Sequence, residues 1–133
     1  MSTETKTTIH TSDAPPAIGP YAQGRSVPLA GRWIVTSGQV GMDPATAALV
    51  PGGIAAETER VMKNLEAVLK AGGAEFRHVV KTTVFLADMA DFTAMNDVYA
   101  RFFPDPKPAR STVAVKGLPR DARVEIEVWA IVS

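Results

Sequence analysis

Two stretches of the chain repeat apolar residues at the helical period. Between residues 54 and 71 the charged side chains lie on one side of a helix, and the apolar ones share the other: Val61, Met62, Leu65, Val68 and Leu69. Gly72 and Gly73 follow, and glycine readily adopts the geometry of a helix end. A second helix is predicted to be capped by Asp91 and to end at Pro104, with an apolar stripe of Phe92, Met95, Tyr99, Phe102 and Phe103.

Other segments have β composition. Residues 79–86 are rich in Val, Thr and Phe, and residues 21–26 are predicted to be extended. Residues 27–29 and 33–37 are predicted to form a hairpin through Ala30 and Gly31, and Gly38 ends or bulges its second strand. Two more strands follow Pro108, joined at residues 117–121.

The predicted elements follow the order β-β-α-β-α-β-β, with residues 1–12 as a tail or a first edge strand. The fold class is α+β, a mixed sheet of about five or six strands whose two helices cover one face. A chain of 133 residues suits a single domain spanning 1–133.

The final strand has two different faces. One is a plain core face of Val124, Ile126, Val128, Ala130 and Val132. The other carries Glu125 and Glu127 and ends with Trp129 and Ile131, which a lone domain would expose to water. We therefore expect contact with a partner, hence an oligomer.

Composition excludes several classes of protein. Lys and Arg together number 14, as do Asp and Glu, so the chain lacks the net positive charge expected of a dedicated nucleic-acid binder. With no cysteine, thiol chemistry and disulfides are excluded, and two histidines without ligand spacing argue against a metal. No apolar run is long enough to span a membrane and residues 1–11 do not read as a secretory signal, so we expect a cytoplasmic protein.

Arg110 is the leading candidate for a binding residue. It follows three prolines, Pro104, Pro106 and Pro108, which stiffen the approach to a strand. A rigidly held arginine can grip a carboxylate with two parallel hydrogen bonds, but it cannot act as a base. The alternative is a surface arginine that closes a loop.

Glu125 is the leading candidate for a catalytic carboxylate. The connection from Arg110 is short, so the two strands are predicted to pair as a hairpin and to flank a small substrate. Arg110 would then bind a carboxylate while Glu125 orders or activates water. The alternative is that Glu125 and Glu127 simply face solvent.

Four further positions are weaker candidates for site residues. Tyr21 is held by the Gly-Pro turn before it and either lines a pocket or packs, and Asn96 is polar within an apolar stripe. Ser37 and Gly38 expose backbone at a strand end. A serine nucleophile needs a histidine, and neither His10 nor His78 has a signature around it, so a Ser-His-Asp hydrolase is not expected.

Together these residues resemble the RidA family, also called YjgF or L-PSP. The matching segments run in order through nearly the whole chain: 17–23 (AIGPYAQ), 34–39 (IVTSGQ), 79–86 (VVKTTVFL), 92–96 (FTAMN), 108–111 (PARS), 118–119 (LP) and 124–127 (VEIE).

The resemblance implies a chorismate-mutase-like fold and a homotrimer with active sites in clefts between subunits. It implies hydrolysis of imines and enamines released by pyridoxal-phosphate enzymes, giving 2-keto acids and ammonia without a metal or organic cofactor. Arg110 would bind the substrate carboxylate and Glu125 would position the attacking water. Tyr21, Ser37, Gly38 and Asn96 would line the cleft.

One position departs from the family pattern. Thr112 stands where well-studied members often carry cysteine, which removes any thiol role and changes the pocket wall. Two other functions remain open: a non-catalytic trimer that senses small carboxylates such as 2-keto acids, and an endoribonuclease or translation inhibitor. The balanced charge makes the nucleic-acid function the weaker alternative.

Overall fold

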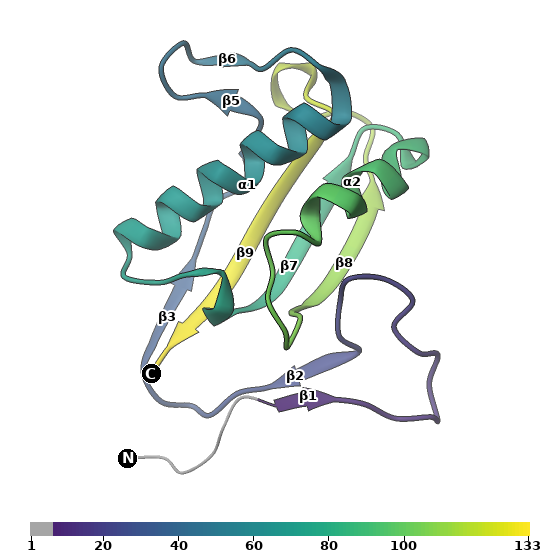
Figure 1. Ribbon diagram of the computed structural model, residues 1–133, viewed down its shortest axis with the longest axis vertical. Helices are drawn as coiled ribbons and strands as arrows, with labels where there is room; N and C mark the ends of the chain where they lie inside the picture. Colours follow the sequence, from purple (N-terminus) through teal and green to yellow (C-terminus); the bar gives the residue numbers. More distant parts are fainter. Residues whose placement is uncertain (1–6) are drawn as a thin grey trace.

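The computed structural model describes residues 7–133 and centres on one mixed sheet (Figure 1). Its strands lie in the order β3 (Arg32–Val35), β9 (Val124–Val132), β7 (Val79–Leu86) and β8 (Ala109–Ala114), and β4 (Gln39–Val40) also pairs with β9. The pair β7–β8 is parallel, and the other pairs are antiparallel. The strands predicted at 79–86 and from Val124 onward are confirmed.

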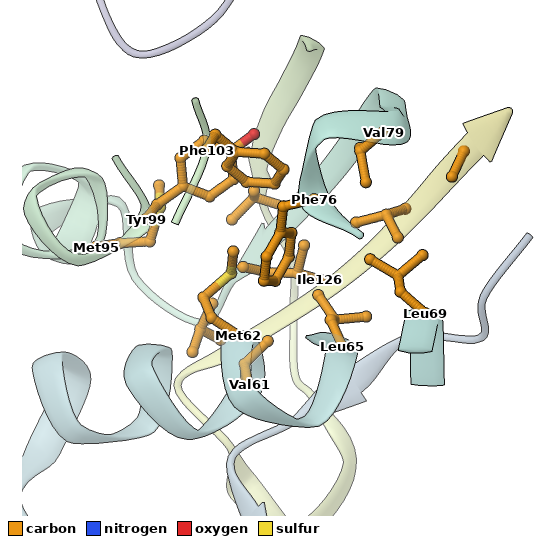
Figure 2. Close-up of a cluster of buried hydrophobic side chains, with 14 of the residues drawn as sticks. Val61, Met62, Leu65, Leu69, Phe76, Val79, Met95, Tyr99, Phe103 and Ile126 are labelled. Carbon is orange, nitrogen blue, oxygen red and sulfur yellow. The ribbon is translucent and has the colours of Figure 1, made fainter. Parts of the chain in front are cut away.

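Helices α1 (Gly53–Ala71) and α2 (Phe92–Tyr99) lie across the same face of this sheet (Figure 1). The apolar stripe predicted for α1 is buried, except that Val68 is 41% exposed. Side chains from both helices and from β9 meet in a single cluster, which Figure 2 shows around Leu65, Tyr99 and Ile126. The predicted α+β arrangement, with both helices on one face, is therefore confirmed.

The predicted hairpin between residues 27–29 and 33–37 is wrong. Strand β3 pairs with the C-terminal strand β9, in a register that sets Ile34 opposite Ala130. Ile34 packs against the core from there, and burial of an apolar side chain favours this distant pairing over a local one. Residues 27–31 belong to no strand.

Two small antiparallel pairs lie outside the main sheet. Strands β1 (Thr7–Ile9) and β2 (Gly24–Ser26) pair below it in Figure 1, and β5 (Met42–Asp43) pairs with β6 (Ala48–Leu49). The edge strand expected within residues 1–12 is thus present at Thr7–Ile9, and the rest of that prediction, residues 1–6, lies outside the described residues. The β5–β6 pair lies between Gly41 and Val50, and the Val50 amide donates to Gly41 O at 3.0 Å.

The second helix is shorter than predicted. It ends at Tyr99, and the chain continues as turns to Phe103, which is still buried in the core. Asp91 stands at the N-cap position but makes no capping hydrogen bond. Asp88 instead accepts a hydrogen bond from the Ala90 amide, in the short 3-10 turn Met89–Asp91 before the helix. Two further 3-10 turns are Phe76–His78 and Pro119–Asp121.

A bulge between β3 and β4 interrupts the regular pairing with β9. Val35 lies opposite Trp129 and Gln39 opposite Ile126, so three residues face two on β9. Thr36 fixes one side of the bulge, because its amide donates to Val128 O and its hydroxyl accepts from Val128 N, both at 3.0 Å. Of the two alternatives predicted for Gly38, a strand end or a bulge, the bulge is confirmed, and it leaves Ser37 exposed.

Candidate functional site

Arg110 projects from β8 toward the helices. Its strand partner is Thr82 on β7, whose hydroxyl meets Tyr99 Oη of α2 at 2.7 Å. Residues directly opposite each other share a face of the sheet, so Arg110 points to the helix side. There its Nη1 donates a hydrogen bond to Asn96 Oδ1 at 2.7 Å.

Three aromatic rings surround the guanidinium of Arg110. Its Cζ lies 4.9 Å from the centroid of Tyr99, 5.3 Å from that of Tyr21 and 5.6 Å from that of Phe92. Contacts of this kind hold a cation by the negative face of the ring. Burial lowers the pKa of Arg110, although the group stays charged.

The charge of Arg110 has no acidic counterpart within residues 7–133. The ion pairs of this part of the chain join other residues, and Asn96 is neutral. A half-buried cation surrounded by rings and one amide leaves donors free for an external acceptor. The arrangement is therefore suited to bind an anion.

The loop before β2 places the Tyr21 ring against Arg110. The Tyr21 amide donates to Gly19 O at 2.8 Å, and the Ala22 amide donates to Pro108 O at 3.0 Å. A Cβ on Gly19 would lie 3.3 Å from the Tyr21 ring and 3.7 Å from Arg110 Nη2. Glycine at this position thus lets the loop approach both side chains closely.

A pocket of about 210 Å³ opens beside the guanidinium, lined by Tyr21, Phe92, Arg110 and Thr112. Thr112 follows Arg110 at the next position on the same face of β8, opposite buried Val84. Its Oγ1 is buried and has no hydrogen-bond partner among the described residues. A buried hydroxyl without a partner is costly, and a bound polar ligand can satisfy it.

Tyr99 forms the floor beneath Arg110 and is fully buried. Burial raises the pKa of Tyr99 to about 12, against the smaller opposing effects of the Thr82 hydrogen bond and the Arg110 charge. The phenol therefore stays protonated beneath the guanidinium at neutral pH.

Glu125 lies elsewhere, and the predicted pairing of its strand with that of Arg110 is wrong. Strand β7 runs between them, with Thr82 opposite Arg110 and Phe85 opposite Glu125. The connection through α2 carries β8 to the outer side of β7, so the short link from β8 to β9 crosses over β7.

The register also separates the two side chains by face. Thr82 and Phe85 are three positions apart, and successive strand residues alternate faces, so Glu125 points away from the helices. Two strand spacings and three residues place the Cα atoms of Arg110 and Glu125 about 14 Å apart. Within one chain they do not form one site.

Gly38 lies directly against Glu125. A Cβ on Gly38 would be 2.7 Å from both Cδ and Oε2 of that carboxyl group, so only glycine fits without a shift. Ser37 is its exposed neighbour in the bulge. The predicted site residues thus form two groups: Tyr21, Asn96, Arg110 and Thr112 on the helix side, and Ser37, Gly38 and Glu125 away from it.

Sequence reasoning missed Phe92 and Tyr99 as neighbours of Arg110 and assigned both to the core. The sequence spacing could have predicted this, because Phe92, Asn96 and Tyr99 are four and three residues apart and so share one helix face. Asn96, the polar residue on that face, indicates that this part of the helix borders a site as well as the core.

A larger surface hollow of about 660 Å³ lies at the end of α1, lined in part by Lys70, Phe76 and Arg77. Arg77 is paired there with Glu75 at 2.8 Å, so this charge is already neutralised. Within residues 7–133, no three His, Asp or Glu side chains gather as metal ligands, and no helix is both long and apolar enough to cross a bilayer.

Comparisons with known proteins agree with the motifs. A family model described as "Endoribonuclease L-PSP" matches residues 11–132. Protein DfrA of Myxococcus xanthus is 50% identical over 123 residues, which cover 92% of this chain and 93% of that protein. The 2-iminobutanoate/2-iminopropanoate deaminase of Mus musculus is 49% identical over 131 residues, covering 98% of this chain and 95% of the relative.

Solved structures show the same fold. RidA from an Antarctic Psychrobacter bacterium matches with a TM-score of 0.74 at 39% identity, covering 95% of this chain and 99% of that one. Escherichia coli TdcF with bound serine matches with a TM-score of 0.73 at 38% identity, covering 96% and 99%. The fold is therefore the chorismate-mutase-like α+β fold that the motifs implied, and the chain belongs to the Endoribonuclease L-PSP family, which includes the RidA proteins.

Proposed function

We propose that this protein is a deaminase that hydrolyses small imines and enamines bearing a carboxylate, such as 2-iminobutanoate and 2-iminopropanoate. The products are a 2-keto acid and ammonia. The observation that carries the proposal is the half-buried Arg110 charge, which faces a pocket of about 210 Å³ with no acidic partner in residues 7–133. The printed activity of the mouse relative supplies the reaction.

In this proposal Arg110 binds the substrate carboxylate. Asn96 takes one Nη1 hydrogen and the rings hold the guanidinium plane, so the remaining N–H groups are presented to an incoming anion in a fixed orientation. The Thr112 hydroxyl supplies a further hydrogen bond on the same side. These contacts hold the substrate so that its imine carbon projects away from Arg110.

Glu125 orders the water that attacks. A new C–O bond forms at the imine carbon, and the water proton accepted by Glu125 passes to the nitrogen. The carbinolamine hydroxyl then gives its proton to the nitrogen as the C=O bond forms and the C–N bond breaks, which releases ammonia and leaves the 2-keto acid. An enamine enters the same path after its β carbon takes a proton from water to give the imine. The substrate itself is electrophilic, so no nucleophilic side chain is required. Gly38 lets the Glu125 carboxylate lie close to the backbone, and Ser37 lines the path by which the substrate reaches it.

The two groups of residues lie on opposite faces of the sheet, so we propose that each active site combines Arg110 of one subunit with Glu125 of the next. The face that carries Glu125 also exposes four large apolar side chains, at 40–57% of their area: Trp33, Val35, Val113 and Trp129. An apolar face of this kind is suited to burial between subunits. The assembly is the homotrimer that the family resemblance implies.

A coupled assay tests the function. A pyridoxal-phosphate dehydratase generates the imine from serine or threonine, semicarbazide traps what escapes, and the 2-keto acid is followed with and without this protein. We expect faster keto-acid release, lost by at least about 100-fold in Arg110→Ala, and largely lost in Arg110→Lys because lysine cannot form the bidentate grip. Unchanged turnover in Arg110→Ala would refute the assigned role.

The same preparation separates the two alternatives. Calorimetric binding of 2-ketobutyrate without turnover on several imines would indicate a sensor of small carboxylates. RNA cleavage that persists through repurification and disappears in Arg110→Ala would favour the activity in the family description. The net charge of zero gives that activity no electrostatic support.

A further inference from the structure

Polar residues on one stripe of α1 hold the strand segments around Glu125. Asn64 is the centre of this group: its Nδ2 donates to Val40 O at 3.1 Å and to Met42 O at 2.9 Å. The two carbonyls stand on either side of Gly41, where β4 turns into β5. One side-chain amide thus fixes the bend of the chain at Gly41.

The orientation of the Asn64 amide is itself fixed. Arg60 Nε donates to Asn64 Oδ1 at 3.1 Å, one helical turn away on α1. Both Nδ2 hydrogens and the carbonyl oxygen therefore have partners, and a flipped amide would place its oxygen against two carbonyls. The contact holds the bend in one position.

Glu57 holds the other segment. Its side chain is buried, and Oε1 accepts a hydrogen bond from the Arg123 amide at 2.9 Å while Oε2 lies 3.4 Å from Arg123 Nε. Gly41 packs on the same residue, since a Cβ there would lie 2.8 Å from Glu57 O. The bend after β4 and the start of β9 thus rest on one turn of α1.

Both anchored segments flank Glu125. Val40 lies opposite Glu125 in the strand register, and Arg123 precedes it by two residues. The carboxyl group in turn contacts Gly38, two residues before Val40. We propose that Asn64 and Glu57 are positioning residues that hold the Glu125 carboxylate and the Gly38 backbone in the geometry that orders the attacking water.

This inference rests on the proposed deaminase function and names the part of the fold that sets its geometry. Losing the Asn64 contacts frees the bend to move, and a displacement near 1 Å at a reacting group can cost about 100-fold in rate. The contacts of Asn64 do not include Arg110, whose guanidinium is held by Asn96 on the other helix, α2. We therefore expect Asn64→Ala to lower kcat by at least about tenfold and to leave KM within about twofold.

Matched variants separate positioning from stability. Lys63→Ala alters an exposed neighbour on α1, and Leu69→Ala removes a fully buried side chain from the same helix. We expect Lys63→Ala to retain wild-type kcat, and Leu69→Ala to lower the denaturation midpoint more than Asn64→Ala while retaining most of kcat. A loss of kcat in Leu69→Ala equal to that in Asn64→Ala would overturn the inference.

A double variant tests whether Asn64 acts through Glu125. Asn64→Ala combined with Glu125→Gln should be no slower than Glu125→Gln alone, because the positioned group is already disabled. Multiplicative losses, or a rise in KM with kcat unchanged, would contradict the proposal.

Amide hydrogen exchange distinguishes failure of this inference from failure of the proposed function. Asn64→Ala should speed exchange in peptides covering residues 38–43 and 123–127 and leave residues 109–114 unchanged, whatever reaction the protein catalyses. If the wild type shows no imine turnover, the deaminase function fails and the positioning of Glu125 for that reaction fails with it, while the exchange data still decide whether Asn64 holds the segments. Unchanged protection in Asn64→Ala would refute the anchoring itself.

Discussion

A mixture of two inactive variants should regain activity if each site takes Arg110 and Glu125 from different subunits. The two variants are Arg110→Ala, which keeps Glu125, and Glu125→Gln, which keeps Arg110. Within one chain these side chains point to opposite faces of the sheet, with Cα atoms about 14 Å apart. A site assembled within one chain would therefore lack one group in either variant and in any mixture.

The expected recovery follows from counting subunit pairs. In an equal, randomly assembled mixture, a site is intact when its arginine comes from the Glu125→Gln chain and its glutamate from the Arg110→Ala chain. Each condition has a probability of about one half, so about one quarter of the sites are intact in any closed ring. The mixture should then show about one quarter of the wild-type kcat, measured with the coupled keto-acid assay.

Equal co-expression of two differently tagged chains yields the randomly mixed assemblies, and detection of both tags in one assembly confirms the mixing without removing the unmixed ones. The control mixes wild type with the double variant Arg110→Ala/Glu125→Gln. Sites formed within one chain would leave about one half of the wild-type activity, whereas shared sites need two wild-type chains, so random assembly leaves about one quarter. A mixture of single variants no more active than the average of its components, with mixed assemblies confirmed by both tags, would refute the shared site.

Two further predictions concern Tyr99 and the apolar face. Tyr99 holds its proton to about pH 12 when folded and to about pH 10 when unfolded, so its contribution to stability is complete below pH 10 and is lost as the pH rises toward 12. The free energy of unfolding of the wild type, relative to Tyr99→Phe, should fall by up to ~3 kcal/mol over that interval in denaturant titrations, and parallel curves would contradict this. The rings of Trp129 and Trp33 pack at a tilt, with 5.5 Å between their centroids, and Trp129→Glu should shift the sedimenting species toward monomer while far-ultraviolet circular dichroism stays unchanged. An unaltered sedimentation coefficient would exclude this face as the contact between subunits.

The elements predicted best are those whose pattern is set by burial alone. Helix α1 and strand β9 follow from side-chain period, because each presents a continuous apolar stripe to one core, and strand β7 follows from its β-rich composition. The boundary of α2 was less predictable. Its stripe continues through Phe102 and Phe103, which pack in the core from turns after the helix has ended at Tyr99. Periodicity reports burial, and it does not report where the hydrogen-bond ladder stops.

Pairing partners were predicted poorly, because a strand's own sequence does not identify its neighbour. Residues 33–37 have a turn and an extended run just before them, which favours a local hairpin by sequence, yet β3 pairs with the other end of the chain. The short pairs β1–β2 and β5–β6 contain at most three residues per strand, so neither has enough alternation to predict it.

The candidate site shows why predicted site residues can be given a wrong arrangement. The short connection suggested that the strands of Arg110 and Glu125 pair as a hairpin within one chain, because only fourteen residues separate the two. Strand β7 enters between them, and an odd register offset of three then turns their side chains to opposite faces. The sequence of β9 already indicated a partner, since the face that bears Glu125 also bears Trp129, which is 40% exposed. Ile131 was expected to be exposed as well, but it is buried within the single chain. If both residues act on one substrate, that partner must be a second copy of the chain, so catalysis requires assembly and the apolar face is part of the active site's construction.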